Sequence, residues 1–307
     1  MKQVFLGLLP LAFMAIGVVF VMLFFYVAIS RFGQKKRKSP FVGLFLRAPG
    51  HTLNTQVDDA VMDLMGLFMV SMLLPLIVIV VPLMQASTSG KAIGIGSWIL
   101  YGLMAAAGLV WLGIKMYRQV HKVRNLRLGY EGEVGVGQEL NQLMPLGFRV
   151  FHDFPADKFN IDHVVIGRTG VFAVETKARA KPDTGDGRQD SRLDYDGHSL
   201  RFPGWTEKEP IEQATRQAQW LSKWLTSAVG ELVPVVAVVA VPGWFITRTK
   251  PAQVLVYNGK RPDKVFPQYS GKPLEPAMIQ RIAHQVEAKC RDVAPRAYVK
   301  DPKPASA

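Results

Sequence analysis

Residues 160–177 read Asn-Ile-Asp-His-Val-Val-Ile-Gly-Arg-Thr-Gly-Val-Phe-Ala-Val-Glu-Thr-Lys, two apolar runs around a turn that glycines flank. Runs of β-branched and aromatic residues on either side of a short turn predict a β-hairpin. Side chains alternate between the faces of a strand, so Glu175 and Lys177 emerge on one face and Thr176 on the other. This is the one place in the chain where the spacing of charged residues indicates chemistry.

The pairing register determines whether the acids of this hairpin form a site. If the turn is centred between Arg168 and Thr169, Asp162 lies opposite Glu175. Opposed carboxylates repel each other unless a cation lies between them, and hard oxygen ligands suit Mg²⁺. In the alternative register, Gly170 takes the left-handed position of a three-residue bulged loop, and Asp162 then lies opposite Thr176. That register predicts an ordinary amphipathic hairpin with two solvated acids.

The composition is unusually apolar for so basic a chain. Of the 307 residues 49% are hydrophobic, and the net charge is +13. Three apolar segments, over residues 4–30, 65–84 and 93–114, are long enough to cross a hydrocarbon layer about 30 Å thick. A cleaved signal peptide is the alternative for the first segment, although no small-x-small cleavage site ends it. Glycines in the third segment (Gly94, Gly96, Gly102 and Gly108) would let helices approach closely, so self-association as a homo-oligomer is an option.

Basic residues predict how the segments are oriented. They follow the first span (Arg31, Lys35, Lys36, Arg37, Lys38 and Arg47) and the third (Lys115, Arg118, Lys122, Arg124 and Arg127), whereas the link between the second and third spans carries only Lys91. The positive-inside rule then predicts an integral protein of the cell (inner) membrane, with the N-terminus outside and both basic segments in the cytoplasm. The single cysteine, Cys290, excludes an intrachain disulfide and agrees with a reducing compartment.

The pattern changes to that of a mixed α/β domain at residue 129. We expect a membrane domain over 1–116, a basic juxtamembrane linker over 117–128, the α/β domain over 129–292 and a disordered tail over 293–307. Besides the hairpin, the periodicity predicts helices over 131–144, 210–224 and 274–293 and strands over 148–154, 235–241 and 254–257. Gly135 and Gly137 should weaken the first of these helices. The fold class is therefore α/β, with about three transmembrane helices followed by a mixed central sheet flanked by helices.

Four motifs, in this order, resemble the nuclease-related domain family, NERD, a branch of the PD-(D/E)xK restriction-endonuclease-like superfamily. They are Gly129-Tyr-Glu-Gly-Glu133, Asn160-Ile-Asp162-His163, Gly170-Val-Phe-Ala-Val-Glu175-Thr-Lys177, and Pro210-Ile-Glu-Gln213 with Gln217 one turn later. The resemblance covers residues 128–241. It implies a restriction-endonuclease-like sheet, a metal-dependent phosphodiesterase site and nucleic acid, with DNA as the expected substrate.

The resemblance also implies roles for particular residues. Asp162 and Glu175 would hold Mg²⁺ or Mn²⁺ with the carbonyl of Thr176, and Lys177 would position the water or stabilise charge on the phosphate. Glu133 would supply a further metal-binding carboxylate, with Glu131 and Glu139 as its rivals, and Gln213 would reach the site from the later helix. Without the resemblance, Gln213 and Gln217 could equally form a solvated helix face.

Two functions follow from these expectations. The first is a membrane-anchored, metal-dependent nuclease that acts at the cytoplasmic face. The alternative is a catalytically inactive NERD-fold module that binds nucleic acid or a protein partner near the membrane. A transporter is disfavoured, because the spans carry no charges at the membrane midplane.

Overall fold

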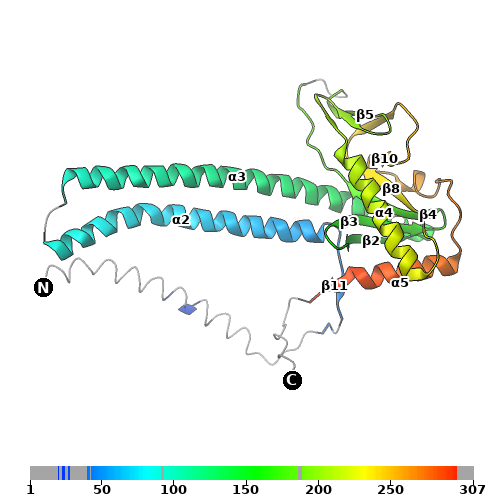
Figure 1. Ribbon diagram of the computed structural model, residues 1–307, viewed down its shortest axis with the longest axis horizontal. Helices are drawn as coiled ribbons and strands as arrows, with labels where there is room; N and C mark the ends of the chain where they lie inside the picture. Colours follow the sequence, from blue (N-terminus) through cyan, green and yellow to red (C-terminus); the bar gives the residue numbers. More distant parts are fainter. Residues whose placement is uncertain are drawn as a thin grey trace. The chain divides into compact units, whose positions relative to one another are not determined.

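The computed structural model of the chain describes residues 43–90, 93–185 and 189–295, together with residues 20, 23, 24, 27, 40 and 41 (Figure 1). These fall into two compact units: residues 59–123 belong to one, and Gly43–Asp58 with Arg124–Ala294 form the other. Most of the expected first span, over 4–30, and the tail beyond residue 295 lie outside the described residues.

Two long apolar helices make up the first unit. They are α2 (His51–Ser89) and the part of α3 (Ile95–Asn141) that precedes Arg124, and Figure 1 shows them side by side. Gln119 Nε2 donates to the carbonyl of Ala60 at 2.9 Å, and Tyr101 Oη to Gln85 Oε1 at 3.0 Å, so the helices are antiparallel. Both are long and apolar enough to cross a membrane; α2 contains the expected span over 65–84, and α3 begins at Ile95, two residues into the expected span over 93–114.

The helix α3 continues where we expected a break. The residues expected to form a linker, 117–128, are helical, and α3 ends at Asn141 rather than Met144. Val136 and Leu140 near its end are buried in the second unit, so core packing outweighs the low helix propensity of the nearby glycines. The helix therefore forms in spite of Gly135 and Gly137, and that these glycines lower its stability stays a prediction.

A five-stranded mixed sheet forms the centre of the second unit. Its order is β10 (Leu255–Tyr257), β8 (Val235–Ala240), β4 (Gly170–Thr176), β3 (Asn160–Gly167) and β2 (Arg149–Pro155). The strands β10, β8 and β4 are parallel, and β4, β3 and β2 are antiparallel. β8 has a continuous apolar run and lies inside the sheet, whereas β10 forms one of its edges.

The hairpin of β3 and β4 has the register that makes a site. Its ladder runs from Gly167 opposite Gly170 to His163 opposite Val174, around a two-residue turn. Continued by one residue, this register places Asp162 opposite Glu175. The alternative with a three-residue bulged loop is wrong; Gly170 instead has φ +146°, which other residues rarely adopt.

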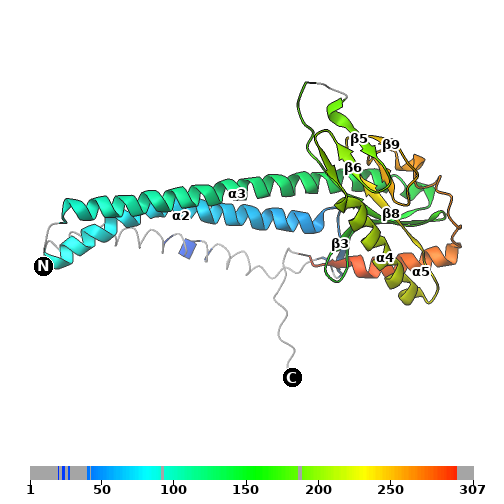
Figure 2. The same cartoon turned by 45° about the horizontal axis from the view of Figure 1, so that its top comes forward.

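Helices cover both faces of this sheet (Figure 2). On one face, Val164 and Ala173 pack against α4 (Glu209–Val229) and α5 (Pro276–Cys290). On the other, Val165 and Phe172 pack against the end of α3. Asp162 and Glu175 have the same strand parity as Val164 and Ala173, so they belong to the face under α4.

The ends of the domain contain a feature that the sequence pattern did not predict. The helix expected over 274–293 ends at Cys290, and residues Arg291–Val293 form β11. This strand pairs antiparallel with β1 (Phe45–Leu46), in a segment that precedes the apolar helices. The segment 43–58 is thus part of the α/β unit.

A second, four-stranded sheet completes the unit. It consists of β7 (Trp205–Glu207), β6 (Leu200–Phe202), β5 (Arg192–Tyr195) and β9 (Phe245–Arg248), in that order. Short 3₁₀ helices occupy Met144–Leu146, Gln189–Ser191 and Pro262–Lys264. The sheet packs on Val239 and on Ile211 at the start of α4 through a separate apolar cluster.

Candidate active site

Asp162, Glu175 and Lys177 meet at the carboxyl end of β4. Lys177 Nζ lies 2.7 Å from Glu175 Oε1, and the backbone N–H of Thr176 donates to Asp162 Oδ2 at 2.6 Å. The backbone N–H of Lys177 donates to the carbonyl of Ala240 on β8 at 2.8 Å. β4 is therefore held on both sides where the charged side chains emerge. The structure brings together three of the predicted site residues.

The helix α4 lays two glutamines over these charges. Gln213, Gln217 and Leu221 follow one another at one-turn spacing, so they share a face of the helix. Gln213 Oε1 accepts a hydrogen bond from Lys177 Nζ at 2.9 Å, and Gln217 Nε2 donates to Glu175 Oε2 at 2.6 Å. Glu175 is only 3% exposed and Gln217 only 2%. These glutamines thus contact the site and do not form a solvated face.

Glu133 approaches the same acids from α3. Its side chain is buried, whereas Glu131 is exposed, and Glu139 accepts a hydrogen bond from Gln142. Of the three rival acids, only Glu133 therefore lies with the predicted site residues.

Burial and mutual repulsion perturb these acids. Burial first, and then the charges of Asp153 and Glu175, raise the pKa of Glu133 to about 8, while Lys177 lowers it. Burial, Glu175 and Glu133 likewise raise the pKa of Asp162 well above its usual value. Lys177 is the one cation that opposes the shift in both cases. The acids at this edge thus disfavour one another's charged forms, and Lys177 offsets this only in part.

A glycine lets α3 come this close to β4. A Cβ on Gly132 would lie 2.6 Å from the Cβ of Ala178, just beyond the end of β4. By contrast, a Cβ on Gly135 would meet no described atom within 4 Å. Gly132 therefore allows α3 to pack closely against the end of β4, next to Glu133.

These two glycines make a matched pair of substitutions. Gly135→Ala should stabilise the protein by about 0.5–1 kcal/mol through helix propensity. Gly132→Ala should destabilise it by about 1–2 kcal/mol, because overpacking of about 1–3 kcal/mol exceeds the same gain. Denaturation of the full-length variants in detergent measures both. Equal shifts for the two alanines would contradict the close packing of α3 on β4.

Two buried histidines form a hydrogen-bonded chain under the site. His152 Nε2 lies 3.0 Å from Asn141 Oδ1, the two Nδ1 atoms of His152 and His163 are 2.9 Å apart, and His163 Nε2 lies 3.2 Å from Thr176 Oγ1. The carbonyl oxygen of Asn141 can only accept, so His152 Nε2 donates to it. His152 Nδ1 then accepts from His163, and His163 Nε2 accepts from the hydroxyl of Thr176. Both rings are neutral in this arrangement, and His163, next to Asp162 on β3, points to the opposite face of the sheet.

The buried, neutral histidine pair should lower the stability of the domain at acid pH. Burial lowers the pKa of His152 to about 4 from 6.5, so the unfolded state binds the proton first as the pH falls. The free energy of unfolding should drop by about 3 kcal/mol in total between about pH 6.5 and pH 4 from this residue. His152→Gln should reduce the slope in pH-dependent denaturation by the share of His152, while the buried His163, whose pKa is also lowered, keeps its own share, and the exposed His198→Gln should leave the slope unchanged. A slope unchanged in His152→Gln would show that His152 is not buried neutral.

Two residues that contact or perturb the site, Gln217 and Asp153, were not predicted from the sequence as site residues. Gln217 bonds directly to Glu175, and its spacing from Gln213 was the available signal. Asp153 raises the pKa of Glu133 from β2, and no motif pointed to it. Over the part of the chain that the structure describes, no three or more His, Cys, Asp or Glu gather closely enough to hold a metal ion by themselves.

The fold and site define an α/β domain with an acid–acid–lysine cluster where the central parallel strand β4 ends. Residues 128–242 match the model of the NERD family, the nuclease-related domain. The match supports membership of that family and a nuclease-related function, while placement in the wider superfamily stays a prediction. No curated protein and no solved structure matches the chain.

Proposed function

We propose that this protein is a membrane-anchored, metal-dependent nuclease that hydrolyses phosphodiester bonds of nucleic acid, with DNA as the expected substrate. The observation that carries the proposal is the register of β3 and β4, which brings Asp162 beside Glu175 and places Lys177 on the same face. The NERD match over residues 128–242 supports the same class of activity.

The residues present fit a divalent cation such as Mg²⁺ or Mn²⁺. Mg²⁺ is commonly bound by one or two carboxylates, with water and substrate phosphate as the other ligands. Asp162 and Glu175 are neighbouring acids whose repulsion a cation would relieve. Gln217 Oε1 is a buried acceptor without a hydrogen-bond partner among the described residues, which suits a site that also holds water. Asp162 and Glu175 would hold the ion, and Glu133 would bind to its water shell.

The chain's own residues would orient the reactants. A bound ion would polarise the phosphate and lower the pKa of its water. An ammonium group has three donors, and Lys177 uses two of them on Glu175 and Gln213. The third remains to orient the attacking water or to stabilise charge that develops on the phosphate. Gln213 fixes Lys177, and Gln217 fixes Glu175, so α4 acts as the support for both charged groups.

The proposal also places the domain at the cytoplasmic face of the cell membrane. Gly43–Asp58 precedes the two apolar helices, Arg124–Ala294 follows them, and the two segments fold into one unit. Both segments must therefore lie on the same side of a membrane, which α2 and α3 would cross out and back. Basic residues near the end of the second crossing, among them Lys115 and Arg118, favour the cytoplasm for that side. In α3, no described atom lies within 4 Å of a Cβ built at Gly96 or Gly102, which leaves room for self-association there.

The activity is tested with the purified full-length protein in detergent. Linear and supercoiled DNA should be cleaved with Mg²⁺ or Mn²⁺, cleavage should stop on addition of EDTA, and excess metal should restore it. RNA of matched length tests the substrate class. A folded protein that cleaves neither nucleic acid with either metal would overturn the proposal and favour the non-catalytic alternative.

A further inference from the structure

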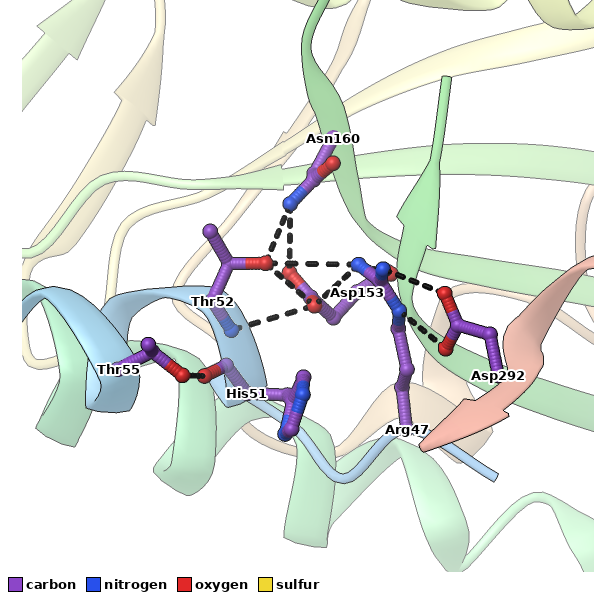
Figure 3. Close-up of polar contacts among 7 residues, drawn as sticks. All are labelled: Arg47, His51, Thr52, Thr55, Asp153, Asn160 and Asp292. Carbon is purple, nitrogen blue, oxygen red and sulfur yellow. Dashed lines mark hydrogen bonds and ion pairs between the residues drawn. The ribbon is translucent and has the colours of Figure 1, made fainter. Parts of the chain in front are cut away.

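A buried carboxylate, Asp153, is the centre of a polar network that joins the start of α2 to the central sheet (Figure 3). Its Oδ2 accepts hydrogen bonds from the backbone N–H of Thr52 at 3.2 Å and from the Thr52 hydroxyl at 2.7 Å, and it pairs with Arg47 at 2.9 Å. Arg47 also forms a two-pronged contact with Asp292, at 2.8 and 2.6 Å. Asp153 is 2% exposed, so every one of these partners offsets a charge that water cannot reach.

The backbone at Asp153 is shaped for this network. Its φ is +50°, which is uncommon for a residue other than glycine. The ladder between β2 and β3 pairs His152 with His163 and Phe154 with Ile161, and it omits Asp153. β2 therefore lacks a regular ladder pair at Asp153, where the carboxylate turns toward the first residues of α2. The positive end of that helix adds to the attraction.

Asn160 connects the network to the active site. Its Nδ2 donates to Asp153 Oδ1 at 3.1 Å and to the Thr52 hydroxyl at 2.6 Å. Its backbone carbonyl accepts a hydrogen bond from Gln217 Nε2 at 3.2 Å, and the same nitrogen donates to Glu175. The position of Asn160 thus helps to set the position of the amide that holds Glu175.

We propose that Arg47, Thr52 and Asp153 are positioning residues of the active site, which act through Asn160 and Gln217 on Glu175. The inference rests on the proposed nuclease function, and it goes further, because it makes the segment before the apolar helices part of the catalytic apparatus. Residues 43–52 lie far from the NERD match at 128–242 in sequence, yet they hold its acidic edge in place.

Thr52→Val tests the proposal with the least disturbance. It removes the hydroxyl that Asn160 and Asp153 share, and it leaves no charge without its partner. Outer-shell groups of this kind typically contribute about 10- to 100-fold to activity. We expect kcat for DNA cleavage by the full-length protein to fall by about tenfold, with KM unchanged. Arg47→Met should cost more, and Arg47→Lys should recover part of the loss. Arg281→Met, which removes an exposed arginine paired with Glu231, should have no effect.

A double-variant cycle with Gln217→Leu separates positioning from general stability. If Thr52 acts through Gln217, Thr52→Val should cost little further activity once Gln217 is leucine. Losses that multiply, or a full kcat in both Thr52→Val and Arg47→Lys, would overturn the inference. The cycle uses no variant at Arg47, so it tests the positioning role even if Arg47→Met does not fold.

Hydrogen exchange supplies a readout that needs no catalysis. In Thr52→Val, the backbone amides of residues 175–177 should exchange faster than in the wild type, and those of β5 should not. If the wild-type protein cleaves nothing, the proposed function fails, and the exchange result still decides whether the network positions this edge. If the wild type is active and Thr52→Val matches it in both rate and exchange, the positioning role alone is wrong.

Discussion

Glu175→Gln is expected to lower DNA cleavage by the full-length protein by at least about 100- to 1,000-fold, the range for loss of one preorganised electrostatic group at an active site. The substitution keeps the shape of the side chain and removes its negative charge. It thereby takes one of the two opposed carboxylates from the proposed metal site and the ion-pair partner, at 2.7 Å, from Lys177. Single-turnover rates with saturating Mg²⁺ measure the loss.

A matched substitution controls for this prediction. Glu212→Gln makes the same chemical change on the exposed face of α4, where Glu212 lies 3.9 Å from Arg216, and it should leave the rate unchanged. Circular dichroism should show that both variants are folded. If Glu175→Gln retains the wild-type rate within about threefold, Glu175 has no part in the chemistry.

Lys177→Met should lower the rate of cleavage by about 100- to 10,000-fold. Among the described residues, Lys177 is the cation that lowers the pKa of both Glu133 and Asp162, and it is the proposed donor to water or phosphate. Its side chain is mostly buried, and Glu175 is almost wholly so. Breaking a buried pair costs about 3–5 kcal/mol, so the melting temperature should fall as well. Rates are therefore compared at a temperature at which the variant remains folded.

A second variant, Lys177→Arg, tests whether the shape of the cation matters as well as its charge. Lys177→Arg should not restore activity, because a planar guanidinium cannot donate from one point to Glu175, Gln213 and a water molecule as an ammonium does. The exposed Lys181→Met should behave like the wild type. Full activity in Lys177→Arg would mean that the site needs only a positive charge.

The central hairpin was predictable because its geometry is local. The turn between Gly167 and Gly170 was enough to predict the hairpin and to reduce its pairing to two registers, and the structure has the one that continues to Asp162 opposite Glu175. The helix α4 was predictable for the same reason, since its buried stripe repeats at each turn and includes Ala214, Ala218 and Leu221. The local sequence pattern was thus sufficient to predict the hairpin that bears Asp162, Glu175 and Lys177, and the helix α4 that covers them.

The remaining contacts join residues that are far apart in the chain, and periodicity has no access to them. Arg47 and Asp153 are separated by 106 positions, and β1 pairs with β11 from the other end of the domain. The role of Gly132 likewise depends on Ala178, which only the tertiary fold places against it. In these cases the sequence contains an unremarkable arginine, aspartate and glycine, and their importance comes from burial and close packing.

Binding of Mn²⁺ to the full-length protein in detergent, followed by electron paramagnetic resonance, tests the central claim most directly because it requires no substrate. Asp162→Asn is the informative variant: it removes a proposed ligand that forms no ion pair with Lys177. We expect one Mn²⁺ site in the wild type that is absent in Asp162→Asn and retained in Glu212→Gln. Equal Mn²⁺ binding by the wild type and Asp162→Asn would contradict a metal site between Asp162 and Glu175.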